Sequence, residues 1–123
     1  MMDKWQFLQN FWSGFGLPAY DESSVPDNAQ LPYITYNASV SDFEHPVLIT
    51  GSLWYRSSSW VEISQKASQI AETVCLSKPQ KIDGGRVRVW IGDTPFAQRM
   101  GDPDDATIRR ILINLMAEFM TAS

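Results

Sequence analysis

Residue types that commonly build active sites are scarce in this chain of 123 residues. It has one cysteine, Cys75, and therefore no internal disulfide bond. Its one histidine, His45, excludes metal sites built from several imidazole ligands. Lysine and arginine total 10 against 14 acidic residues, which gives a net charge of −4. The chain therefore lacks the excess of basic residues that is typical of a protein that reads duplex DNA. No apolar run approaches the length of a membrane span, and we expect no membrane partner.

The remaining composition is that of an ordinary globular protein. Hydrophobic residues make up 44% of the chain and charged residues 20%, which argues against global disorder. The length fits one domain, which we predict to span residues 1–123. Five tryptophans are a high number for this length, and side chains of this kind supply core and interface area.

The first half of the chain predicts a helix, a connector and a strand hairpin. A stripe of apolar residues at helical spacing predicts a helix over residues 2–15; its members are Trp5, Leu8, Phe11, Trp12 and Phe15. Residues 17–32 form a proline-rich connector, which is either a solvated loop or a segment lying on a neighbouring surface. Alternating residues predict a strand over 33–40, and 47–56 predicts a second strand antiparallel to it.

A second helix is predicted from Trp60 to Leu76. Ser59 and Glu62 have the spacing of a capping box, and Pro79 follows the expected end. The predicted buried stripe consists of Trp60, Ile63, Ala67, Ile70 and Val74.

The last forty residues predict a strand over 86–91, a long loop and a closing run over 108–121. Gly84-Gly85 is a turn before the first strand, with a short strand possible ahead of it. The closing run fits two periods, because its apolar residues share one face either as a strand or as a helix. Uniformly apolar odd positions favour the strand, whereas the propensities of residues such as Met116 and Ala117 favour a helix. If the run is a strand, we expect it to pair with 86–91.

No catalytic, cofactor-binding or metal-binding residues stand out. His45 lies in a polar turn and is expected to be exposed, and Cys75 is expected to be a buried structural thiol. The acidic turn Asp102-Pro103-Asp104-Asp105 lacks the ligand spacing of a calcium loop. We therefore predict a protein that is not an enzyme. The alternative is an enzyme or small-molecule-binding domain, which would need a closed polar pocket joining Arg86, Arg88 or His45 to Cys75 or the acidic turn.

The loop and its flanks have the character of a contact surface between proteins. An aromatic and methionine-bearing segment adjoins an acidic turn and a cluster of arginines. The turn and the arginines are either ordinary solvated surface residues or the two sides of ion pairs between subunits. The predicted interface residues are Pro95, Phe96, Gln98, Arg99, Met100, Asp102, Asp104, Asp105, Arg109 and Arg110.

The order of these elements resembles the siphophage tail terminator family, also called tail completion or minor tail proteins, with the lambda tail terminator as the familiar example. The resemblance covers most of the chain as a pattern, including P-Y-I-T-Y at 32–36. Its most specific parts are P-F-A-Q-R-M at 95–100, Asp104-Asp105 and E-F-M-T at 118–121. It implies that 108–121 is a strand. Together with the residues it predicts an α/β (α+β) domain: a mixed, mostly antiparallel sheet of about four or five strands flanked by two helices.

The resemblance also implies a function in the virion. Family members form a ring, a hexamer by expectation, on the last ring of the tail tube protein. The ring stops tube polymerisation and offers a surface to the connector or stopper protein of the head. DNA passes through the lumen without sequence readout, and no cofactor is implied. The protein would reside in the tail or neck of the virion, and in the host cytoplasm during assembly. A head-side connector or stopper is the alternative within the same class.

Overall fold

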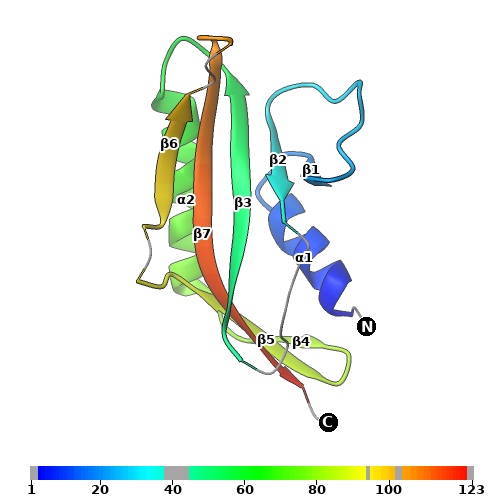
Figure 1. Cartoon of the computed structure of the whole chain (residues 1–123). Coiled ribbons are helices and arrows are strands. Elements are labelled where there is room, and N and C mark those ends of the chain that lie inside the picture. Colours follow the sequence, from blue (N-terminus) through cyan, green and yellow to red (C-terminus); the bar gives the residue numbers. More distant parts are fainter. Residues whose placement is uncertain (1–2, 38–44, 94, 102–103, 122–123) are drawn as a thin grey trace.

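A strand of fourteen residues runs through the middle of the molecule, and the other elements are arranged around it (Figure 1). The computed structural model describes residues 3–37, 45–93, 95–101 and 104–121. The helices are α1 (Lys4–Ser13) and α2 (Val61–Leu76). The strands are β1 (Ala19–Asp21), β2 (Tyr33–Tyr36), β3 (Val47–Arg56), β4 (Gln80–Ile82), β5 (Gly85–Trp90), β6 (Ala97–Gly101) and β7 (Ile108–Thr121).

The closing run is therefore a strand, as the resemblance implied. Its odd positions from Ile111 to Phe119 are all buried, which is the pattern of a strand with one face on the core. One edge of β7 pairs with β3 along ten residues. The other edge is shared: it pairs first with β6, through residues 109–113, and then with β5, through residues 116–121. The predicted pairing of 86–91 with the closing run is confirmed.

The sheet is mixed and mostly antiparallel, as predicted, but the described residues form seven strands of it, more than the four or five expected. The strand order is β1-β2-β3-β7-β5-β4, and β6 is attached to β7 outside that path. Only β1 and β2 run parallel to each other. The predicted hairpin of 33–40 with 47–56 is confirmed, although β2 ends at Tyr36 and residues 38–40 lie outside the described part of the chain.

Both helices pack on the same face of the sheet. The α2 stripe of Ile63, Ala67, Ile70 and Val74 is buried in the core. The α1 side chains reach the same face: Phe7 makes an edge-to-face contact with Phe119, and the ring of Trp12 lies over Gly51 on β3. A Cβ at position 51 would lie 2.8 Å from that ring, so this close approach requires glycine.

The start of the first helix differs from expectation. Asp3 is its N-cap and exchanges hydrogen bonds with Gln6 in a capping box, which the sequence analysis missed. The predicted apolar stripe was also wrong by one residue. Trp5 is 49% exposed and Phe7 is buried in the core in its place, because the helix turns residues 7, 8, 11 and 12 toward the sheet.

Two expectations about the second helix were wrong as well. Trp60 is the N-cap of α2 and makes no side-chain capping bond. The hydroxyl oxygen of Ser59 accepts from the backbone N–H of Val61, so it closes a local turn and does not reach Glu62. Cys75 is exposed, because it lies beside Val74 on the solvent side of the last helical turn.

Candidate assembly interface

The predicted contact region contains a strand that the sequence analysis assigned to a loop. Residues 95–101, which we call the contact segment, run from Pro95 into β6. All five residues of β6 are exposed, and β6 pairs with β7 along one side only. A strand whose two faces both meet solvent shows no alternation of apolar and polar residues, so its sequence carries no periodic signal.

Asn114 on β7 fastens the start of the contact segment. Its side-chain nitrogen donates to the carbonyl oxygen of Pro95 at 2.9 Å and to Oε1 of Gln98 at 3.3 Å. Its backbone N–H donates to the carbonyl oxygen of Phe96 at 2.8 Å. Asn114 itself is only 8% exposed, and Phe96 packs partly against the core. The segment is therefore held on a rigid strand while its outer side chains remain free of the core.

The two predicted arginines on the helix side gather at one tryptophan. The guanidinium groups of Arg99 on β6 and Arg109 on β7 each lie 5.1 Å from the ring of Trp60. Arg99 also donates to the hydroxyl of Ser64 at 3.4 Å, and Arg109 donates to the carbonyl oxygen of Ser58 at 3.1 Å. Nε of Arg109 is buried and has no hydrogen-bond partner among the described residues. Contacts of this type orient arginine without neutralising it.

Arg110 points to the opposite face of the sheet. It lies over the ring of Trp54 at 4.8 Å, and its Nε donates to Oγ of Ser52 at 3.1 Å. The indole N–H of Trp54 in turn donates to Oγ1 of Thr35 at 2.8 Å. Met100, the cross-strand neighbour of Arg110, is 39% exposed on that face. The predicted residues of the contact region thus divide between two faces of the sheet.

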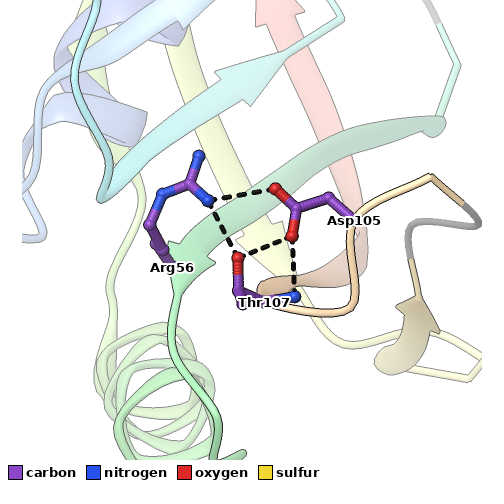
Figure 2. A network of polar contacts seen from close by, with 3 residues as sticks. All are labelled: Arg56, Asp105 and Thr107. Carbon is purple, nitrogen blue, oxygen red and sulfur yellow. Dashed lines mark hydrogen bonds and ion pairs between the residues drawn. The ribbon is translucent and has the colours of Figure 1, made fainter.

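Asp105 is held within its own chain (Figure 2). Its carboxylate accepts from Nη1 of Arg56 at 3.0 Å and from the backbone N–H and hydroxyl of Thr107 at 2.8 and 2.6 Å. Arg56 also donates to the hydroxyl oxygen of Thr107 at 2.8 Å. The bonds from Thr107, and then the one from Arg56, lower the pKa of Asp105 to about 2. This network fixes the turn before β7. Asp104 is exposed, and Asp102 lies outside the described residues.

A shallow groove follows the free side of β6. It has a volume of 250 Å³, and Phe96, Ala97 and Arg99 line one side. Small side chains of α2 line the other side, namely Ser64, Ala67, Ser68 and Ala71, with Ile111 of β7 also contributing. The groove lies directly beside the exposed strand, so the strand and the helix face together present one surface.

The enzyme alternative required a closed polar pocket, and the structure offers an open recess. Cys75 and Arg88 do line one cavity of 420 Å³, with largely apolar neighbours such as Trp90 and Ile91. Both side chains are exposed, and neither His45 nor the acidic turn lines that cavity. The described residues contain no group of three or more side chains suited to hold a metal ion. No helix in the described ranges is long and apolar enough to cross a membrane.

Comparison with known proteins shows a likeness of fold to a solved structure. No protein-family model matches the chain, and no curated protein matches it. A chain in the solved structure of the virion of a native gene transfer agent particle superposes with a TM-score of 0.62 at 16% sequence identity. The superposition covers 87% of this chain and 81% of that chain. The two chains therefore share a fold over most of their lengths.

Proposed function

We propose that this chain is a structural protein of a virion, without a catalytic role. The support is the fold that it shares, over 87% of its length, with a chain of a gene transfer agent virion. The contact segment is consistent with assembly, because a fully exposed strand is fastened to the central strand of the sheet and not left as a loose loop. Residues on a rigid strand can bind a partner with little loss of conformational entropy.

Within that class, we propose the role of tail terminator. This step rests on the sequence resemblance at residues 95–100, 104–105 and 118–121. A single domain would form a ring, by expectation a hexamer, on the end of the tail tube. The ring would stop tube growth and meet the connector or stopper of the head, while DNA passes through its lumen. The protein would be located in the tail and neck of the virion, after assembly in the host cytoplasm.

The contact segment would join neighbouring subunits in this ring. Gln98, Arg99 and Met100 are exposed, and Arg99 is pre-oriented on Trp60. The acidic turn was predicted to form ion pairs between subunits. Asp105 of that turn is engaged by Arg56 of its own chain, so its charge is already paired, whereas Asp104 is exposed.

The test is a tube-capping assay. Tail tube protein is polymerised with and without the purified chain, and tube lengths and end structures are recorded by negative-stain microscopy. We expect capped tubes of limited length and a ring-sized mass by light scattering in the presence of tubes. Tubes that grow equally long and remain bare at both ends would refute the terminator role.

A sedimentation experiment separates the terminator from the head-side alternative. The chain is mixed with purified tails or with DNA-filled heads and the pellets are compared. We expect the chain in the tail pellet. Recovery with heads alone would show that the chain is a connector or stopper protein, and would leave the broader virion proposal standing.

A further inference from the structure

No helix among the described residues packs on the face of the sheet turned away from α1 and α2, although Thr35, Ser52 and Asn114 on that face are buried. Strand alternation places one set of residues on the core and the other set on this outer face. Leu48 is 49% exposed there, and Met120 and Met100 are 40% and 39% exposed. Leu112 and Met116, between them on β7, are half-buried. An apolar strip of this kind on an open sheet face is unusual for a surface that meets only water.

The same face carries positive charge in an acidic protein. Strand register and alternation place five basic side chains on it: Arg56, Lys81, Arg86, Arg88 and Arg110. Two carboxylates adjoin them: Glu118, which lies 3.9 Å from Arg88, and Asp105, which pairs with Arg56. The outer face therefore has a net positive charge, although the whole chain has a net charge of −4. The rest of the surface must be correspondingly more acidic.

Two of these arginines are held in place by aromatic rings. Arg88 lies over Trp90 at 4.4 Å and Arg110 over Trp54 at 4.8 Å. Ser52 gives Arg110 a second anchor through a hydrogen bond. Side chains ordered in this way lose less freedom when a partner binds.

The mixture of residues fits a protein partner better than a nucleic acid. Nucleic-acid surfaces gather lysine and arginine for phosphate contact. Protein interfaces are enriched in aromatic residues, methionine and arginine. The outer face carries Trp54 and Trp90, three methionines and four arginines, but a single lysine, Lys81.

The chain has a complementary acidic surface at the far edge of the sheet. Residues 16–37, which contain β1, the β1–β2 connector and β2, include Asp21, Glu22 and Asp27 and no lysine or arginine. Glu22 and Asp27 are exposed, and Asp21 is fixed by two hydrogen bonds from Ser23. β1 lies at one end of the strand order and β4, with Lys81, at the other (Figure 1). Lys81, Arg86 and Arg88 are thus separated from the acidic edge by β3 and β7, whereas Arg56 and Arg110 lie on those two strands.

We infer that the basic outer face of the sheet binds the acidic β1–β2 connector of a second copy of this chain. The contact is heterologous, because it joins two different surfaces, and contacts of that kind generate rings. The inference rests on the proposed self-assembly and adds a second contact to the one at the contact segment. It also assigns residues 22–32, the part of the predicted 17–32 connector that follows β1, to a neighbouring surface and not to solvent alone.

Charge reversal tests this pairing directly. One variant, Lys81→Glu with Arg86→Glu, reverses exposed charges on the outer face; the other, Glu22→Lys with Asp27→Lys, reverses the connector. Self-association is followed by analytical ultracentrifugation, with and without tail tubes, and folding by thermal melting. We expect each variant alone to associate at least about tenfold more weakly, because like charges then face each other. The matched control is Glu72→Lys with Lys78→Glu, at two exposed positions that belong to neither set of charges, and it should associate normally.

Mixing the two variants supplies the decisive result. In an alternating assembly every contact is again between opposite charges, so the equimolar mixture should regain association that neither variant has alone. This recovery cannot come from variants that have merely unfolded. No recovery in the mixture, or normal association of the outer-face variant, would overturn the inference.

Further outcomes distinguish this inference from the proposed function. If the variants still form rings on tubes, only the inference fails. A fluorescence anisotropy titration compares duplex-DNA binding by the parent and by the outer-face variant. If the variant forms rings but no longer binds DNA that the parent binds, the face binds nucleic acid and the inference is wrong. If the unaltered chain stays monomeric both alone and on tubes, the proposed function and the inference fall together.

Discussion

Asn114 is the position at which the anchoring of the contact segment can be tested most directly. Replacing it with alanine removes the side-chain bonds to Pro95 and Gln98 but leaves the backbone bond to Phe96. The bond of 2.9 Å is well formed and the one of 3.3 Å is long, so we expect a loss of about 1 kcal/mol from the two together. The carbonyl oxygen of Pro95, an exposed residue, can then turn to water.

The effect should be local. A loss of about 1 kcal/mol corresponds to about fivefold more frequent opening of residues 95–101. Native-state hydrogen exchange read by mass spectrometry would show faster exchange in peptides covering β6 and little change in peptides covering β3. The matched control is Thr50→Val, which alters the residue opposite Asn114 on β3 and touches no bond to the segment. Unchanged exchange in β6 of Asn114→Ala, or equal acceleration throughout the sheet, would refute a local anchoring role.

Three further predictions concern single side chains. Met100→Ala should leave the melting temperature nearly unchanged while weakening assembly, whereas Phe96→Ala should cost about 2 kcal/mol in chemical denaturation, because Phe96 is partly in the core. Gly51→Ala should destabilise the fold by about 1–3 kcal/mol, because the new Cβ meets the ring of Trp12, and a melting temperature equal to that of the parent would contradict this. The folded-state pKa of Asp105 is about 2, below its ordinary 3.8, so its stabilising contribution is present above pH 4 and is lost as the pH falls toward 2. The difference in melting temperature between the parent and Asp105→Asn should therefore shrink over that interval, and a constant difference would count against the network.

Long elements with one buried face were predictable from the sequence. The α2 stripe from Ile63 to Val74 and the alternation of β3 are strong signals, because each repeats over many residues. β7 was harder, since its outer face also carries apolar residues such as Leu112 and Met116 and so imitates a helix. The apolar residues of this outer face made the strand period hard to distinguish from the helical one. They lie on the same surface that we infer to bind a second copy of the chain.

The short strands β1 and β6 could not be predicted from a repeating pattern of buried residues. β1 has three residues and forms only because β2 lies parallel beside it, with Gln9 of α1 donating to the carbonyl oxygen of Ala19. β6 has no buried face at all, and its existence depends on pairing with β7. Whether each of these two segments forms a strand depends on a pairing partner that is distant in the sequence. Local sequence patterns do not contain that information. The interface residues were identifiable as a group, but their division between two faces needed the register of β6 on β7.

The exposed edge of β6 raises the question of how such a protein avoids uncontrolled strand pairing. A free edge is a template for addition of another strand, and proteins blunt it by keeping the strand short and charged. β6 has five residues, and Arg99 lies in its middle with its guanidinium group turned to Trp60. Trp60 and the two arginines that contact it lie on the helix-side face of β6 and β7. We therefore expect neighbouring subunits to meet through side chains, at the groove beside α2 and on the outer face, and not through a continued sheet. A substitution of Arg99 with valine would test this: it should promote irregular aggregates in light scattering, whereas Gln98→Val, on the other face of the same strand, should do so less. Equal behaviour of the two variants would show that Arg99 does not guard the edge.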